Sequence, residues 1–163
     1  MYREILTKAI IAKGETTINE SETVLTNDEI SKVLGCWIIN HKYDVTSINN
    51  KVIVKGQFDA FLWYGKDNNT NSELIKKTFD YQSEIPYSFT LESYPLDDKC
   101  EIKCIIKNDP SCVSMTYKNN QIDIEYKIHI AIDIIGETKI KIKVDDIIIE
   151  DTINTDYMKD KNG

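Results

Sequence analysis

Four cysteines and two histidines are the residues of this 163-residue chain that could form a metal site or a nucleophilic centre. Cys100 and Cys104 lie in a segment whose alternating pattern predicts a strand. Their side chains would then share one face and stand roughly 13 Å apart. Two thiolates on one zinc ion are only about 4 Å apart, and a disulfide also needs a short span. We therefore expect two buried thiols that are bound neither to zinc nor to each other.

Cys112 differs, because the hairpin predicted below places it opposite Lys127, on the polar face of a sheet. We expect an exposed thiol that cross-links neighbouring molecules under oxidising conditions; an unreactive surface cysteine is the alternative. Cys36 and His41 are near each other in sequence, but a catalytic pair would rest on that proximity alone. We predict no catalytic residue, no cofactor site and no metal site, and a protein that is not an enzyme.

Aromatic side chains offer a different chemistry, that of a contact surface. Trp37, Trp63, Tyr64 and Tyr126 could stack against a sugar, as in β-sandwich carbohydrate modules. Tyr64 and Tyr126 share the alternation of the core positions, however, so we expect them in the interior. Trp63 falls on the opposite face, where exposed aromatic residues mark a contact surface. We favour a protein partner there, and the candidate contact residues are Trp37, His41, Tyr43, Phe61 and Trp63.

Strands must position these side chains, since alternation of apolar and polar residues dominates the chain. Every second residue from Ile122 to Ile134 is apolar and the residues between are mostly polar, which predicts a strand with one buried face. Asn119 and Asn120 predict a two-residue turn before it. The expected pairs across this hairpin are 118 with 121, 117 with 122, 115 with 124 and 113 with 126.

Gly136 follows this strand and leaves two readings open. A tight hairpin at Gly136 and Glu137 would set isoleucines against lysines on one face, which the alternation excludes. The parity of Ile140 and Ile142 allows either a three-residue loop around Gly136 or one long strand that bends there.

The other strands are shorter alternating runs bounded by turn residues. They are expected at residues 52–64, 73–81, 87–91 and 99–107. Gly56 is predicted to be a bulge or bend, and Pro110 is predicted to end the last of these runs. Residues 15–31 are polar and predict a loop with at most one helical turn near 27–29.

No linker divides the chain, so we expect one all-β domain over residues 1–150. Its expected form is an antiparallel β-sandwich, rather than a barrel, with long final strands and little helix. A composition of 41% apolar and 29% charged residues is typical of a globular protein. Residues 151–163 are expected to form a short, acidic, flexible tail.

The formal charge of −7 argues against nucleic acid as a partner, because phosphate binding needs clustered lysine and arginine. The same charge disfavours anionic membrane surfaces. No run approaches the roughly 20 apolar residues of a membrane-spanning helix, and no signal peptide is visible. We therefore expect no membrane insertion and a chain made in a cytoplasm, where thiols start out reduced.

Several motifs in one order give the chain a resemblance to a known family. The segment 35–44 reads Gly-Cys-Trp-Ile-Ile-Asn-His-Lys-Tyr-Asp, and together with 2–14, 59–64, 108–112 and 135–139 it resembles outer spore coat protein E (CotE) of endospore-forming bacteria. The strand-rich part from about Lys51 to Val144 also resembles the SPOCS domain of spore-coat assembly proteins.

The resemblance implies a morphogenetic scaffold rather than an enzyme. Such a protein is made in the mother-cell cytoplasm and deposited in the spore coat around the forespore. There it associates with itself as a homo-oligomer and attaches other spore coat proteins. A carbohydrate-binding module for spore or cortex glycans is the alternative function, suggested by the β class and the aromatic residues.

Overall fold

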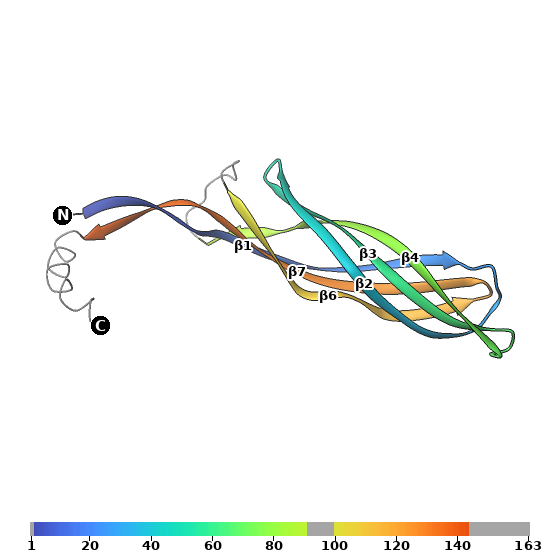
Figure 1. The fold of residues 1–163 in the computed structure, drawn as a ribbon. Helices are drawn as coiled ribbons and strands as arrows, with labels where there is room; N and C mark the ends of the chain where they lie inside the picture. The colour runs from blue at the N-terminus through green and yellow to red at the C-terminus, as the bar shows by residue number, and fades with distance from the viewer. Residues whose placement is uncertain (1, 91–99, 144–163) are drawn as a thin grey trace, which may run out of the picture.

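The computed structural model describes residues 2–90 and 100–143, which form seven strands in two antiparallel sheets (Figure 1). The strands are β1 (Tyr2–Leu25), β2 (Ile30–Ile48), β3 (Lys51–Lys66), β4 (Asn71–Ile85), β5 (Tyr87–Phe89), β6 (Glu101–Lys118) and β7 (Gln121–Lys143). One sheet has the order β5-β1-β7-β6 and the other the order β2-β3-β4. This architecture confirms the predicted all-β, sandwich-like antiparallel fold, and no helix occurs among the described residues.

Strand β7 supplies the largest share of the core, as its alternation predicts. Its inward residues from Ile122 to Ile134 are almost fully buried between the two sheets. The inward positions of β3 meet them from the other layer, and the rings of Phe58 and Tyr126 contact edge to face with centroids 4.8 Å apart. Burial of this many β-branched and aromatic side chains is the main force that holds the layers together.

The turn between β6 and β7 forms at Asn119 and Asn120, as predicted, and Asn119 has a φ of 56°. The pairs nearest the turn also agree with the prediction: Lys118 with Gln121, Tyr117 with Ile122 and Met115 with Ile124. A second asparagine pair, Asn49 and Asn50, makes the turn between β2 and β3 with φ values of 51° and 63°. The same Asn-Asn pair that predicts the turn between β6 and β7 therefore occurs here as well.

Beyond this point the predicted register is wrong at Cys112. The pairing shifts between Cys112 and Ser114, so that Cys112 lies opposite Tyr126 and not opposite Lys127. One extra residue in a strand exchanges the two faces. Val113 is therefore exposed, and Cys112 is half-buried and packs against the core.

Gly136 lies within one long bent strand, the second of the two predicted possibilities. β7 continues through it and pairs with β1 up to Tyr2 opposite Lys143. A side chain at Gly136 would approach the Ile11 Cδ1 atom within 2.8 Å, so the glycine allows β1 to bulge toward β7 at this bend. Figure 1 shows these two strands continuing as a narrow ribbon past the other strands.

The prediction of a loop at residues 15–31 is wrong. β1 continues to Leu25 and remains paired with β7 down to Gln121. Only the short connection 26–29 separates β1 from β2, and it contains no helical turn. Asp28 anchors this connection, because its carboxylate accepts a hydrogen bond from the buried Tyr64 hydroxyl (2.9 Å) and contacts the Lys66 ammonium (3.4 Å).

The predicted strand end at Pro110 is wrong, and of the two predicted possibilities for Gly56 the bulge is excluded. β6 does not end before Pro110 but runs through it, with shifts in register on both sides that remove the need for a backbone N–H there. Gly56 is not a bulge, since β3 pairs with β4 without interruption. The glycine is needed instead because a Cβ atom there would overlap the Tyr81 ring.

Three buried tyrosines should make the fold sensitive to alkali. Burial raises the pKa of Tyr64, Tyr81 and Tyr126 above the ordinary tyrosine value. The folded state therefore holds these protons more tightly than the unfolded state. Their contribution to stability is fully present below the unfolded pKa of about 10 and is lost as the pH rises beyond it.

We expect the free energy of unfolding to fall steeply above about pH 10, the pKa of an unfolded tyrosine. Circular dichroism and the ultraviolet absorbance of tyrosinate, followed together through a pH titration, would measure this. Tyr126→Phe should make the decline shallower, whereas Tyr117→Phe, at an exposed site, should not change it. Ionisation of all tyrosines near the ordinary value in an intact fold would contradict the expectation.

Candidate functional site

The outward face of the three-stranded sheet carries a group of large apolar side chains. Trp37 of β2 pairs with Phe61 of β3, and Trp63 of β3 pairs with Leu74 of β4. These residues face away from the sandwich because the alternate residues of β3, such as Leu62 and Tyr64, point into the core. We call the group the outer aromatic patch; its members are Trp37, Ile39, Phe61, Trp63 and Leu74.

The patch side chains are unusually exposed for their size. Trp37, Ile39, Trp63 and Leu74 have between 40% and 52% of their surface accessible, and Phe61 is half-buried beside them. Gly35 lies under this group: a Cβ atom there would be 3.3 Å from the Trp37 ring, so the missing side chain lets the indole lie close to the strand. Adjacent exposed apolar residues of this kind mark an interaction surface.

Polar groups border the outer aromatic patch. The Asp59 carboxylate accepts hydrogen bonds from the Asn40 amide (2.8 Å) and the Thr78 hydroxyl (2.7 Å), and the Lys76 ammonium lies 3.7 Å away. These two hydrogen bonds lower the pKa of Asp59, and the bond from Asn40 has the larger effect. An apolar centre with a polar border is the usual anatomy of a protein–protein contact.

His41 and Tyr43 do not belong to this patch. A bulge interrupts the pairing of β2 with β3, because Asn40 and His41 lie opposite the single residue Phe58, and Asn40 has a φ of 58°. This bulge turns His41 toward the opposite side of the sheet, where its Nε2 atom lies 2.5 Å from the Tyr81 hydroxyl and its ring is next to Tyr43. Burial lowers the pKa of His41, against an opposing effect of Asp109. The structure thus groups three of the five predicted contact residues.

The cysteines fall into two sets. Cys104 lies in β6 opposite Ile132 and faces the hydrophobic core, as its alternation predicts. Cys100 packs against the same core. Cys36 of β2 and Cys112 of β6 come from different sheets and are in hydrogen-bonding contact. This contact raises the pKa of the Cys36 thiol and lowers that of Cys112. Sequence analysis missed the pair because it arises from the register shift beside Cys112.

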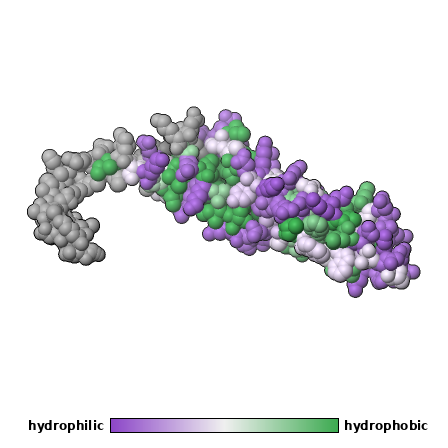
Figure 2. Space-filling view, in the orientation of Figure 1, coloured by the Kyte–Doolittle hydropathy of each residue, from purple (hydrophilic) through white to green (hydrophobic). Residues whose placement is uncertain are grey.

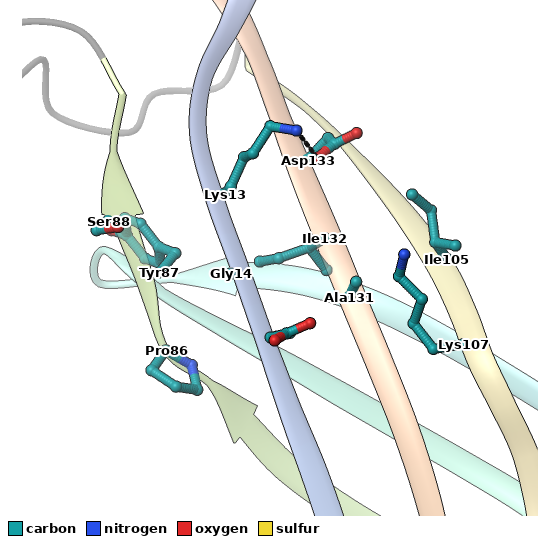
Figure 3. Close-up of a pocket in the computed structure, with 11 residues that line it drawn as sticks. Lys13, Gly14, Pro86, Tyr87, Ser88, Ile105, Lys107, Ala131, Ile132 and Asp133 are labelled. Carbon is teal, nitrogen blue, oxygen red and sulfur yellow. Dashed lines mark ion pairs between the residues drawn. The ribbon is translucent and has the colours of Figure 1, made fainter.

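A hollow of about 640 Å³ lies on the outward face of the four-stranded sheet (Figure 3). It forms where the small Ala131 is surrounded by longer side chains of β1, β5 and β6. The Lys13 ammonium and the Asp133 carboxylate are 3.8 Å apart at its border, and Glu15 and Lys107 add one charge of each sign. These charges balance, and no buried polar side chain occurs among the described residues, so the hollow has no strong preference for a charged ligand.

The described residues, 2–90 and 100–143, contain no group of three or more histidine, cysteine, aspartate or glutamate side chains arranged to hold a metal ion. Within the same ranges no helix is long and apolar enough to cross a membrane. Figure 2 shows that hydrophobic residues instead gather in patches between hydrophilic ones on the visible face of the molecule.

The family model of outer spore coat protein E (CotE) matches residues 1–163, the whole chain. This chain belongs to the CotE family. No curated protein and no solved structure matches it significantly. CotE is a structural family of the spore coat, so membership makes this chain a spore coat protein located in the coat. Membership also suggests interaction with other coat proteins.

Proposed function

We propose that this CotE-family chain is a scaffold of the endospore coat that assembles with copies of itself and recruits outer coat proteins. It acts without catalysis, in the mother-cell cytoplasm first and in the coat around the forespore afterwards. The outer aromatic patch supports the proposal, because it presents large, exposed apolar side chains together on one face of a paired sheet. The domain over residues 1–150 provides that scaffold, and residues 151–163 are not needed for self-association.

The size of the patch limits how tightly one contact can hold. Complete burial of a large apolar side chain contributes about 1.5–3 kcal/mol. Four side chains that are about half exposed would therefore contribute roughly 3–6 kcal/mol when a partner covers them. Association itself costs an estimated 4–15 kcal/mol. A contact through the patch alone is weak, and stable assembly needs additional contacts that act together.

Open sheet edges supply such contacts. β5 pairs only with residues 12–14 of β1, so most of that edge of β1 has no partner strand in the described part of the chain. β2, β4 and β6 are edge strands as well. Unpaired edges present rows of backbone donors and acceptors that another strand can extend. A patch on one face and free edges at the sides favour growth of an array over a single closed pair.

Replacing Trp63 by alanine should weaken self-association of the purified chain. We expect the dissociation constant to rise about tenfold or more, which corresponds to about 1.4 kcal/mol. Sedimentation velocity or size-exclusion chromatography with light scattering, at micromolar protein, would measure it. Leu25→Ala removes an exposed apolar side chain at the end of β1, in the other sheet, and is the matched control.

Deletion of residues 152–163 should leave the assembly unchanged. Circular dichroism must show the same β content in all variants, so that loss of assembly is separated from loss of fold. If the tail deletion alone dissolved the oligomer, the interface would lie elsewhere. A strictly monomeric chain retained on a glycan matrix would instead identify the patch as a carbohydrate-binding surface.

A further inference from the structure

Cys36 and Cys112 are positioned as a pair across the two layers of the sandwich. Cys36 belongs to β2 and Cys112 to β6, and each of these is an edge strand of its own sheet. Both thiols pack against the core and line a single hollow of about 260 Å³, together with Gly35, Ser114 and neighbouring apolar residues. The two thiols are in hydrogen-bonding contact. Both side chains are only half-buried, so small molecules can reach them.

We propose that Cys36 and Cys112 form a reversible disulfide that links the two sheets when a small-molecule disulfide reaches the chain. The proposal does not depend on the function of the outer aromatic patch. It replaces the expected cross-link between molecules with one inside a molecule, because Cys112 shares a hollow with Cys36 and lies beside it.

The chemistry is a pair of thiol–disulfide exchanges. The Cys112 thiolate attacks one sulfur of the oxidant, a mixed disulfide forms, and the first thiolate leaves. Cys36 then loses its proton to solvent and attacks the Cys112 sulfur, which expels the second thiolate. Two protein thiols are oxidised by two electrons, and one disulfide is reduced to two small thiols. The lowered pKa of Cys112, caused by its contact with Cys36, favours Cys112 as the attacking group.

The other cysteines are poorly placed for this reaction. Cys104 lies eight residues from Cys112 along β6, a distance of roughly 25 Å on an extended strand. Cys100 lies farther along in the same direction. A disulfide requires Cα atoms about 4.4–6.8 Å apart, so neither can reach Cys112 without unfolding the strand.

The bond would close the sandwich along the line where β2 and β6 meet. The Tyr117 hydroxyl already donates a hydrogen bond to the Ser31 carbonyl oxygen (2.8 Å) along that line. A disulfide between residues 36 and 112 would enclose a long loop, and such bonds stabilise chiefly by restricting the unfolded chain. We expect the melting temperature of the oxidised protein to rise by roughly 5–10 °C.

The test is oxidation of the full chain by oxidised glutathione, followed by a non-reducing digest and mass spectrometry. The expected product is a peptide pair linked through Cys36 and Cys112, with loss of two of the four thiols. Because the link forms within one molecule, its rate of formation at a fixed concentration of oxidised glutathione should not depend on the protein concentration. Dithiothreitol should reverse both the link and the shift in melting temperature.

Cys36→Ser should abolish the linked peptides and leave glutathione on Cys112, whereas the double variant Cys100→Ser, Cys104→Ser should form the link normally. If Cys36→Ser does not fold, the digest of the wild-type chain still shows whether Cys36 and Cys112 are linked. A persistent mixed disulfide on the wild-type chain, or Cys112 linked to Cys112 of another copy, would overturn the proposal.

Discussion

Replacement of Ile128 by aspartate is expected to unfold the domain. Ile128 is fully buried in the centre of β7 and lies opposite Ile18 of β1. An aspartate there would place a charge between two apolar layers, where no described polar side chain is buried to receive it. An unpaired buried charge costs several kcal/mol. Native proteins typically have a free energy of unfolding of only about 5–15 kcal/mol, so most of the stability would be lost.

The neighbouring residue provides the control. Lys127 points out of the same strand into solvent, and Lys127→Asp changes more charge than Ile128→Asp but buries none. The melting temperature of Lys127→Asp should stay within a few degrees of wild type, because surface substitutions usually change stability by about 0.5 kcal/mol or less. Thermal melts followed by circular dichroism would compare the two. Equal shifts for both variants would disprove a sheet with one buried face.

Replacement of Gly14 by alanine is the second prediction with a large effect. A Cβ atom at Gly14 would overlap the Pro86 carbonyl oxygen and lie 2.9 Å from the Tyr87 Cα atom. These are backbone atoms, so no side-chain rotation relieves the clash, and β5 must move away from β1. We expect a loss of about 1–3 kcal/mol, as in other overpacked sites. In a chain of this length that corresponds to roughly 3–10 °C in melting temperature.

Whether Gly14→Ala lowers or raises the stability tests the close approach of β5 to β1. In an open strand position glycine to alanine stabilises a protein by about 0.4–1 kcal/mol, because it restricts the unfolded chain. A destabilised variant would therefore report the close approach of β5. Hydrogen exchange should also increase at Thr90, whose N–H donates to the Ile11 carbonyl oxygen (2.9 Å). Ser88→Ala, at an exposed position on β5, should change neither measurement.

Sequence reasoning succeeded where one face of a strand is wholly apolar. In β7 every second residue from Ile122 to Ile134 is buried, and in β3 the same holds from Val52 to Tyr64 except at Gly56. Parity alone placed Trp63 outside and Tyr126 inside. It failed in β1, because inward positions such as Glu20 and Glu22 near the end of the sandwich are polar. Glu20 accepts a hydrogen bond from the Tyr126 hydroxyl (3.5 Å), so a polar residue there is satisfied, but the alternation disappears.

The candidate site shows the same division. Trp37, Phe61 and Trp63 lie together because strand pairing between β2 and β3 is regular at those positions. His41 and Cys112 were misplaced because each lies at a bulge, and one extra residue changes which face a side chain joins. Bulges are fixed by the fit of one strand against another, so local sequence carries little information about them.

The pairing of β1 with β7 also determines the order in which the strands can pair during synthesis. β2, β3 and β4 follow one another and can pair as soon as they are synthesised. β1 must wait for a strand that begins at Gln121, and at about 5–20 residues per second this delay is roughly ten seconds. During that time β1 lacks its main partner, and the β7 strand of a neighbouring chain could pair with it instead. Chains made close together on one messenger RNA would therefore have a kinetic opportunity to exchange strands before either is complete.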